Sequence, residues 1–493
     1  MDHASKDESL SSIIYNYKHG FSGFAAMLTA EQAEQLAELP EVISVQRSRR
    51  YRTATTRSWD FLGLDYQKPS ELLRRSNHGQ EIIIGIIDTG NSATVLAAID
   101  DAMHDGVDVL SLSLEVQENS FGALHAVQKG ITVVYAAGNS GPVPQVVGNT
   151  APWVITVAAS KIDRSFPTVI TLGDKTQIVG QSMYSEGKNS SGSTFKLLVD
   201  GGLCTDNDLN GTDIKGRVVL CTSLGIPPLM LFPVALKNVL DAGGSGLIFA
   251  QYTTDILDVT KNCNGTACVL VDLDTAQLIS SYISGTSSPV AKIEPPRTVT
   301  GEGILAPKVA AFSSRGPSVD YPDIIKKECL GRSLIRLTTE VETLTQHRAA
   351  DPGLIYDIDP TDYNKFFACT IKTSASCNAT MLPRYHLNLP SIAVPDLRDP
   401  TTVSRTVRNV GEVNAVYHAE IQCPPGVKMV VEPSVLVFDA ANKVHTFKVS
   451  FSPLWKLQGD YTFGSLTWHN DNKSVRIPIA VRITIQDFYA DVA

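Results

Sequence analysis

The chain has 493 residues, of which 43% are hydrophobic and 19% are charged. These proportions are ordinary for globular proteins with packed cores, and the length predicts about three domains. The formal net charge of −9 and the pI near 5.6 argue against a nucleic-acid-binding surface. No apolar run in the sequence is long enough to cross a bilayer.

The opening residues, MDHASKDESLSS, lack an apolar core, so the sequence itself gives no signal peptide. The even number of cysteines, eight, and five N-x-S/T sequons favour export instead. Chance sequons and free core thiols are the alternative explanation. The combination favours a secreted protein whose leader is missing from this sequence. The sequons begin at Asn189, Asn210, Asn264, Asn378 and Asn472.

Residues 10–48 predict a small α/β unit. Thr29–Gln32, TAEQ, is a capping box that begins a helix, and Pro40 ends it. The basic stretch Arg47–Arg57 has no pattern and predicts an exposed linker open to proteolytic cleavage. Three segments have the residue pattern expected of β-strands: Ser12–Tyr17, Phe21–Leu28 and Val42–Val45.

The stretch Glu81–Gly90, EIIIGIIDTG, carries an acidic residue at the end of an apolar run. Ile82–Ile87 has no polar break, which predicts a strand buried on both faces of a sheet. Asp88 would emerge at the carboxyl end of that strand, where ligands and catalytic groups of α/β sheets gather. A buried or half-buried carboxylate there needs a partner.

After Glu81 the pattern predicts alternating strands and helices with short crossovers, and hence a parallel sheet. Two helices are expected, from about Thr94 to His104 and around Phe121–Lys129. The strands after the first are Val107–Leu114, Ile131–Ala137 and Val154–Ala158.

The composition and the predicted secondary structure change twice in the rest of the chain. Thr168–Glu294 is rich in glycine and sequons and predicts a separate small α/β module. Glu328–Ala350 has leucines at helical spacing. From about His386 onward, seven short alternating strands with turns between them predict a β-sandwich.

Asp88-Thr89-Gly90 has two chemical interpretations. An aspartic protease needs two such loops with paired carboxylates, and no second D-[ST]-G occurs in the chain. The other interpretation is the Asp of a Ser-His-Asp system, which orients the histidine. Taken alone, a strand-end Asp that makes an Asx turn explains the motif better.

Two further motifs favour the Ser-His-Asp interpretation of Asp88. Asn139 follows a predicted strand in AAGNSGP, where its amide could donate to a developing oxyanion. Phe312–Pro317 reads FSSRGP. Together with IIDTG and AAIDDAMHDGVDVLSLSL, these strings resemble the subtilisin family, specifically the plant subtilases. The resemblance implies a Ser-His-Asp endopeptidase that cuts peptide bonds through a serine acyl-enzyme.

The resemblance covers nearly the whole chain. SIIYNYKHGFSGFAAMLTAEQAEQLAELPEV resembles the family's inhibitory propeptide, and TTRSWDFLGL resembles the start of the mature enzyme. GRVVLC and AGGSGLIF resemble the inserted protease-associated domain. ADPGLIYDI, NLPSI and SRTVRNVG resemble the approach to a carboxy-terminal fibronectin type III-like domain.

The implied fold class is α/β: a truncated subtilisin-like parallel-sheet core with an α+β propeptide, an inserted protease-associated α/β domain and a C-terminal fibronectin type III-like β-sandwich. The expected boundaries are 10–54 for the inhibitor-like propeptide and 55–167 for the first part of the core. They continue with 168–295 for the protease-associated domain, 296–385 for the rest of the core, and 386–493 for the sandwich.

The catalytic His and Ser motifs of the family, G-H-G-T-H-T and G-T-S-M, are both absent. Carried over residue by residue, the resemblance leaves only Asp88, as triad acid, and Asn139, in the oxyanion hole. Gly285-Thr286-Ser287-Ser288 imitates the nucleophile motif but is followed by Pro289, and we expect a loop there. His78, His104 and His125 are expected to be structural, because nothing in the sequence brings them to Asp88.

The cysteines suggest three local bridges, although spacing does not determine connectivity. No cluster has zinc-site spacing and no calcium loop is present, so neither a metal nor a cofactor is expected. The suggested pairs are Cys204 with Cys221, Cys263 with Cys268, and Cys369 with Cys377.

The missing segments also affect the expected fold. Loss of the neighbouring strands would leave the Asp88 strand as an apolar edge, which invites aggregation. Loss of the helix that carries the serine would leave a void in the core, or Leu330–Leu344 would fill it. We therefore expect a marginally stable core between sound end domains.

The sequence thus predicts a subtilisin-like serine endopeptidase by family that is impaired or inactive as written. The alternative is a pseudoprotease, a binding or inhibitory protein that acts through its propeptide-like and protease-associated domains. Expected partners are protein or peptide substrates if the chain is active, and other subtilases through the propeptide-like segment, with no nucleic acid and no membrane. The expected location is extracellular, in the apoplast or cell wall.

Overall fold

The computed structural model describes fourteen stretches of the chain and forms two compact units, Met1–Ser58 and Trp59–Ala493. Within the described part, no helix is long and apolar enough to span a membrane. The residues described are 12–17, 23–42, 45, 57–62, 71–88, 92–114, 121–183, 194–224, 231–254, 263, 265–326, 351–363, 384–455 and 459–484.

The N-terminal unit consists of a hairpin and one helix. Strands β1 (Ile13–Tyr17) and β2 (Gly23–Ala26) pair antiparallel. Helix α2 (Ala30–Ala37) begins with the predicted capping box, because the Thr29 hydroxyl accepts from Gln32 N and the Gln32 side chain accepts from Thr29 N. Of the predicted strand at 42–45, the two described residues lie outside any strand.

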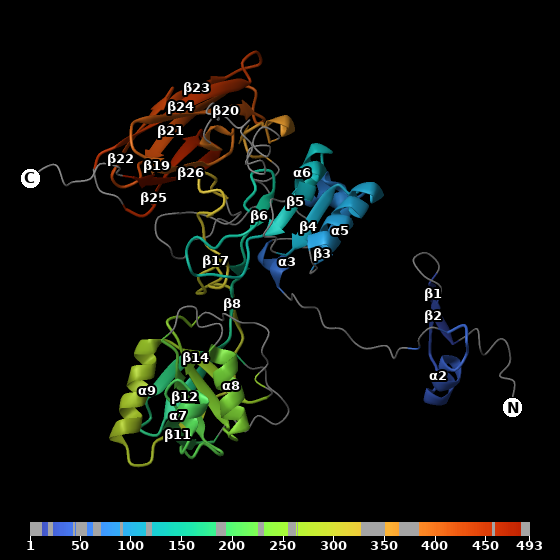
Figure 1. Cartoon of the computed structure of the whole chain (residues 1–493), viewed down its shortest axis with the longest axis vertical. Helices are drawn as coiled ribbons and strands as arrows, with labels where there is room; N and C mark the ends of the chain where they lie inside the picture. The colour runs from blue at the N-terminus through green and yellow to red at the C-terminus, as the bar shows by residue number, and fades with distance from the viewer. Residues whose placement is uncertain are drawn as a thin grey trace, which may run out of the picture. The chain divides into compact units, whose positions relative to one another are not determined.

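The core of the second unit is a four-stranded parallel sheet in the order β3-β4-β5-β6 (Figure 1). Helices α5 (Ser92–Asp105) and α6 (Phe121–Gln128) follow the first and second strands and pack on the same face. This confirms the predicted βαβ succession. The strands are β3 (Ile84–Asp88), β4 (Val109–Ser113), β5 (Thr132–Ala136) and β6 (Ile155–Val157).

The opposite face of this sheet is only partly covered. One row of cross-strand neighbours runs over it through Ile86, Ser111, Val134 and Ile155. The two central side chains are half-buried, whereas Ile86 is 75% exposed and Ile155 43%. Parallel sheets are normally covered on both faces, so the prediction that β3 is buried on both sides is wrong. Within the described residues β3 is the edge strand of this sheet, as predicted.

Three short elements precede the sheet: helices α3 (Ser58–Phe61) and α4 (Glu71–Arg75) and the 3₁₀ turn η1 (Asn77–Gly79). Beyond β6, two small ladders join distant parts of the chain. Strand β7 (Ser160–Lys161) pairs with β17 (Lys308–Val309), and β8 (Arg164–Ser165) pairs with β16 (Val299–Thr300). The chain therefore leaves the core and returns to it along neighbouring paths.

The residues between these ladders form a separate barrel module. Its seven strands close in the order β10-β14-β13-β12-β11-β15-β9, with helices α7 (Asp206–Leu209), α8 (Leu231–Asp241) and α9 (Leu273–Gly285). The disulfides Cys204–Cys221 and Cys263–Cys268 confirm two suggested pairs. The strands are β9 (Pro167–Leu172), β10 (Gln177–Ser182), β11 (Lys196–Asp200), β12 (Val218–Thr222), β13 (Gly246–Ala250), β14 (Ala267–Val271) and β15 (Val290–Ile293).

The C-terminal part is the predicted β-sandwich. Its sheets have the orders β18-β20-β24-β22 and β19-β26-β25-β21-β23, and rings such as Phe447 and Trp468 meet edge to face between them. A 3₁₀ turn, η3 (Arg384–His386), precedes it. The strands are β18 (Leu354–Ile355), β19 (Ile392–Leu397), β20 (Thr401–Asn409), β21 (Ala415–Gln422), β22 (Val427–Glu432), β23 (Val435–Phe438), β24 (Val444–Pro453), β25 (Thr462–His469) and β26 (Ser474–Ile483).

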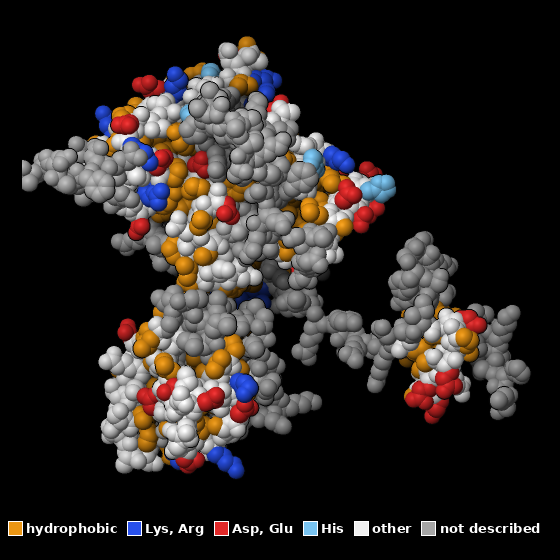
Figure 2. All heavy atoms as spheres, viewed as in Figure 1, with side chains coloured by type: hydrophobic (Ala, Val, Ile, Leu, Met, Phe, Trp, Pro, Cys, Tyr) orange, Lys and Arg blue, Asp and Glu red, His pale blue; other side chains and the backbone are white. Residues whose placement is uncertain are grey.

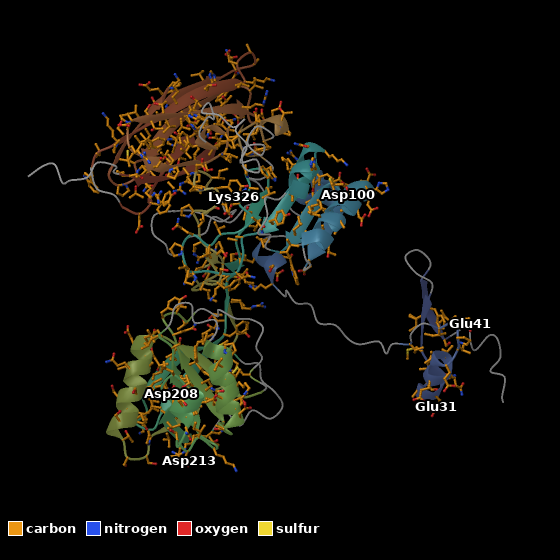
Figure 3. The ribbon with its side chains drawn as sticks, in the orientation of Figure 1. Glu31, Glu41, Asp100, Asp208, Asp213 and Lys326 are labelled. Atoms are coloured by element: carbon orange, nitrogen blue, oxygen red, sulfur yellow. A yellow bond between two sulfur atoms is a disulfide. The ribbon has the colours of Figure 1, made fainter. Side chains whose placement is uncertain are left out.

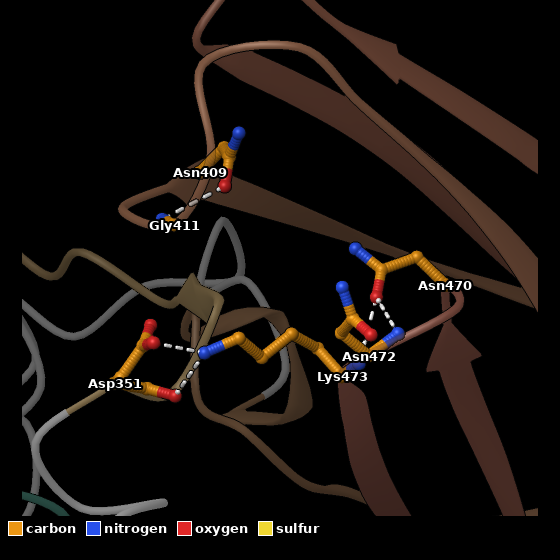
Figure 4. Close-up of polar contacts among 6 residues, drawn as sticks. All are labelled: Asp351, Asn409, Gly411, Asn470, Asn472 and Lys473. Carbon is orange, nitrogen blue, oxygen red and sulfur yellow. Dashed lines mark hydrogen bonds and ion pairs between the residues drawn. The ribbon is translucent and has the colours of Figure 1, made fainter.

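Residues that precede the sandwich in sequence are part of its fold. Strand β18 pairs with β20, and Asp357 forms an ion pair with Arg408 at 2.5 Å. Lys473 forms an ion pair with Asp351 and donates to its carbonyl at 3.2 Å (Figure 4). The Leu330–Leu344 segment and the third suggested disulfide, Cys369 with Cys377, lie outside the described residues.

Lys326 connects the segment after the Phe312–Pro317 string to the sheet (Figure 3). Its Nζ donates to the carbonyl oxygens of Val154, at 2.7 Å, and of Ala151. Burial lowers the pKa of Lys326 to about 7. A neutral amine still has two N–H donors, one for each carbonyl, so deprotonation leaves both hydrogen bonds in place.

We expect Lys326 to make the stability of the fold increase with pH. The folded-state pKa is depressed below the ordinary value, so the unfolded chain binds this proton more tightly between about pH 7 and that value. The free energy of unfolding should therefore rise through that window. In Lys326→Met this rise should be smaller, as measured by urea unfolding from pH 6 to 10 with far-UV circular dichroism.

The control is Lys129→Met, an exposed lysine that follows α6. It should keep the pH dependence of the parent. Identical pH profiles for the parent and Lys326→Met would contradict the assignment.

Candidate functional site

Asp88 and Asn139 lie at the same end of the parallel sheet, where its strands have their carboxyl ends. We call this end the carboxyl edge. Asp88 is the last residue of β3, and Asn139 follows the carboxyl end of β5. Strand β4 lies between them, so their strands are separated by two inter-strand spacings, about 10 Å. Ser113, at the end of β4, is the direct neighbour of Asp88 in the ladder. The carboxyl edge therefore presents a carboxylate, a hydroxyl and an amide.

The turn that carries Asn139 is held by the Phe312–Pro317 string. Gly141 N donates to Phe312 O at 2.8 Å, and Ser314 N donates to Gly138 O at 3.0 Å. Ser140 N donates to the buried Ser314 hydroxyl at 2.9 Å. These bonds fix the residues on both sides of Asn139, while its own side chain is exposed.

Glycine is required at position 141 of this turn. A Cβ there would lie 1.9 Å from Ser313 O and 2.7 Å from Ala311 O, closer than any contact tolerates. The backbone at Gly141 lies too close to residues 311–313 for any side chain to fit between them. The sequence string GNSGP is thus explained by packing against FSSRGP, in addition to the position of Asn139.

Asn149 is a structural residue of this edge that the sequence did not indicate. Its Nδ2 donates to Leu114 O and to Ala136 O, both at 2.8 Å, so one buried amide joins the ends of β4 and β5. Its backbone carbonyl accepts from Thr156 Oγ1 at 2.6 Å. In the sequence, Asn149 appears only as an asparagine that follows a glycine near a turn. This pattern is too common to indicate that its side chain joins two strands.

The three histidines considered as substitutes lie away from Asp88. His78 belongs to η1, before β3 begins, and His104 lies near the end of α5, so both are at the amino-terminal end of the strands. His125 is exposed on α6, whereas its neighbours Leu124 and Ala126 are buried. Among the described residues, these elements bring no histidine to the edge where Asp88 lies.

The imitation of the nucleophile motif, Gly285–Ser288, belongs to the barrel module. Gly285 is the last residue of α9, Thr286 is its C-cap, and Ser287 and Ser288 form the predicted loop before β15. The loop leads into a strand of the closed barrel, whereas Asp88 belongs to the four-stranded parallel sheet.

The edge also offers no preformed metal site in the part of the chain that can be described. Those ranges contain no group of three or more His, Cys, Asp or Glu side chains that could hold an ion. The arrangement can offer hydrogen-bond acceptance from Asp88 and donation from Asn139 to a bound group.

Three family descriptions match successive parts of the chain. Residues 1–54 match Peptidase inhibitor I9, residues 82–328 match the Subtilase family, and residues 386–481 match the Fibronectin type-III domain. These matches correspond to the N-terminal unit, to the sheet with the barrel module, and to the sandwich.

Curated relatives cover almost the whole chain. The chain is 30% identical to the subtilisin-like proteases SBT3.9 and SBT3.8 of Arabidopsis thaliana, over 99% of its own length and 92% of theirs. The alignments extend over 705 and 724 positions, whereas the chain has 493 residues. Long stretches of both relatives therefore face gaps in this chain.

Among solved structures, an aminopeptidase from Aneurinibacillus sp. strain AM-1 is similar over 28% of this chain and 34% of its own, at 18% identity. Its TM-score is 0.22, which carries no argument. The family matches and the near-complete coverage of the relatives decide the question: the chain belongs to the plant subtilisin-like protease family, the subtilases.

Proposed function

We propose that this subtilase does not hydrolyse peptide bonds, with Asp88 and Asn139 as remnants of its catalytic site. The observation that carries the proposal is the short connection after Asp88. Strand β3 ends at Asp88 and α5 begins at Ser92. Three residues cannot contain a histidine-bearing segment, and the G-H-G-T-H-T and G-T-S-M motifs are absent from the sequence.

The chemistry of a Ser-His-Asp system supports this proposal. The histidine takes the serine proton and later delivers it to the leaving amine, and the aspartate only orients that histidine. The elements that carry His78 and His104 place both histidines at the amino-terminal end of the strands, whereas Asp88 ends β3 at the carboxyl end. The amide of Asn139 can stabilise an oxyanion only after a nucleophile has attacked. What remains could bind a peptide carbonyl without cleaving the bond.

The purified chain should show no product burst with an activated peptide ester and no labelling by a fluorophosphonate probe, which needs an activated serine. Asp88→Ala and Asn139→Ala should leave the background rate unchanged. A mature, intact plant subtilase serves as the positive control. Labelling, or a burst that Asp88→Ala abolishes, would show that a working nucleophile exists.

A second candidate function is inhibition of intact subtilases by the N-terminal unit. Residues 1–54 match a peptidase inhibitor description, and the unit contains the hairpin and capped helix described above. None of its side chains whose burial is described is buried, and Ile14, Phe24 and Met27 are exposed. Figure 2 shows hydrophobic side chains on the surface of this unit. Such an apolar surface on a small unit suits docking to a protein partner.

We expect the full chain to slow peptide hydrolysis by an active plant subtilase in a dose-dependent way. Met27→Glu should weaken this inhibition at least tenfold, because it places a charge on the apolar surface. Leu454→Glu is the control, at a site in the sandwich that is 61% exposed, compared with 73% for Met27. Equal inhibition by both variants would remove the N-terminal unit as the cause.

We also propose that the protein is extracellular and glycosylated. The two disulfides require an oxidising compartment. Two of the five sequon asparagines lie in the described part of the chain, Asn210 and Asn472, and both are exposed. Asn472 lies in the turn between β25 and β26, where Asn470 Oδ1 accepts from Asn472 N and Lys473 N (Figure 4).

After expression through a eukaryotic secretory pathway, endoglycosidase treatment should reduce the mass of the protein. Asn210→Gln and Asn472→Gln should each remove one glycan from the intact mass. Asn207→Gln, on the adjacent α7 but outside any sequon, should remove none. Secreted protein with unmodified asparagines at both positions would argue against the proposal.

A further inference from the structure

Two histidines face each other across neighbouring strands of the sandwich. Strand β21 pairs antiparallel with β25, and His418 is the direct partner of His469 in this ladder (Figure 1). Ala419 N donates away from β25, to Ser434 O at 2.9 Å, so the backbone groups of His418 point toward β25. The two histidines therefore form a hydrogen-bonded pair, with Cα atoms about 5.5 Å apart and side chains on the same face of the sheet.

These two side chains lie on the outer face of the sandwich. Their neighbours in the strands, Tyr417 and Trp468, are buried in the core between the sheets. Successive residues of a strand point to opposite faces, so His418 and His469 point away from that core. His418 is exposed, and the side chain of His469 is 42% exposed. Both imidazole rings can therefore be reached from solvent.

A carboxylate contacts one ring nitrogen of the pair. Glu420 Oε2 lies 3.6 Å from His469 Nδ1. In metal sites of proteins, a carboxylate beside one nitrogen of a histidine orients the ring and makes the other nitrogen a better ligand. The Nε2 atom of His469 is thus the one left to coordinate an ion. Within the described residues, neither ring nitrogen of His418 takes part in a hydrogen bond or ion pair.

We propose that His418 and His469 together bind one divalent transition-metal ion of the Zn²⁺ and Cu²⁺ class. Imidazole nitrogen is a preferred ligand of these ions, whereas Mg²⁺ and Ca²⁺ prefer oxygen. Metal–nitrogen bonds of about 2.1 Å place two ligand nitrogens about 3.4 Å apart in a tetrahedral site. Exposed imidazoles at facing strand positions reach this separation by rotation of their side chains. The pair supplies two ligands, and water completes the coordination.

The surroundings of the pair are compatible with a bound cation. On the flanking strands, His418 lies beside Val435 and His469 beside Ser474, so neither neighbour carries a charge. Arg476 is the basic residue of the next row. Thr467 lies between it and Glu420, which separates their strands by two inter-strand spacings, about 10 Å. The carboxylate is therefore the charged group in contact with the pair.

Titration calorimetry of the metal-free full chain with Zn²⁺ should show a site that Mg²⁺ does not occupy. His418→Gln and His469→Gln should each weaken Zn²⁺ binding at least tenfold, because each leaves a single imidazole. Glu420→Gln should weaken it about tenfold through the orientation of His469. The matched control is His104→Gln, at an exposed histidine of α5, which should bind as the parent does.

Thermal unfolding gives an independent readout. An ion held between β21 and β25 binds only the folded sandwich, so Zn²⁺ should raise the Tm of the parent and of His104→Gln. The rise should be absent in His418→Gln and in His469→Gln, whose metal-free Tm values should match that of the parent. Equal Zn²⁺ affinity in the parent and both variants would overturn the proposal. So would a loss confined to one of the two histidines, or an equal loss in His104→Gln.

Discussion

A parallel sheet is normally covered by other elements on both of its faces. In this subtilase the four-stranded sheet meets the condition on the α5–α6 face alone. Gly85 illustrates the asymmetry, because a Cβ there would touch Leu110 at 3.0 Å, whereas its neighbours Ile84 and Ile86 are exposed. The sheet therefore has one face packed against helices and one face on which isoleucines are exposed.

The carboxyl edge of the sheet is nevertheless well ordered by its own contacts. The Asn149 amide joins β4 to β5, and the 312–314 backbone holds the turn that carries Asn139. Neither set of bonds depends on a histidine or serine of a catalytic triad. The turn that presents Asn139 to solvent is therefore held by contacts of the sheet end and of the 312–314 segment.

Much of the fold could be predicted from local pattern, as the capping box at Thr29 and the two disulfides show. The exposure of β3 could not be predicted, because an apolar run indicates a buried strand but does not show whether other segments are present to cover it. The role of Asn149 depends on residues 13 and 35 positions away in sequence, and the close approach at Gly141 depends on Ala311 and Ser313, 170 and 172 positions away. Neither leaves a periodic signal in the sequence.

The paired ladders β7–β17 and β8–β16 have a consequence for how the protein could change over time. The barrel module enters and leaves through two adjacent paths, so its ends are close together and its own sheet is closed. Such a module can be exchanged, lengthened or lost with little rearrangement of its host, since termini that lie close together make insertion tolerable. In contrast, the four-stranded sheet is open at β3, which has a paired neighbour on one side only among the described residues.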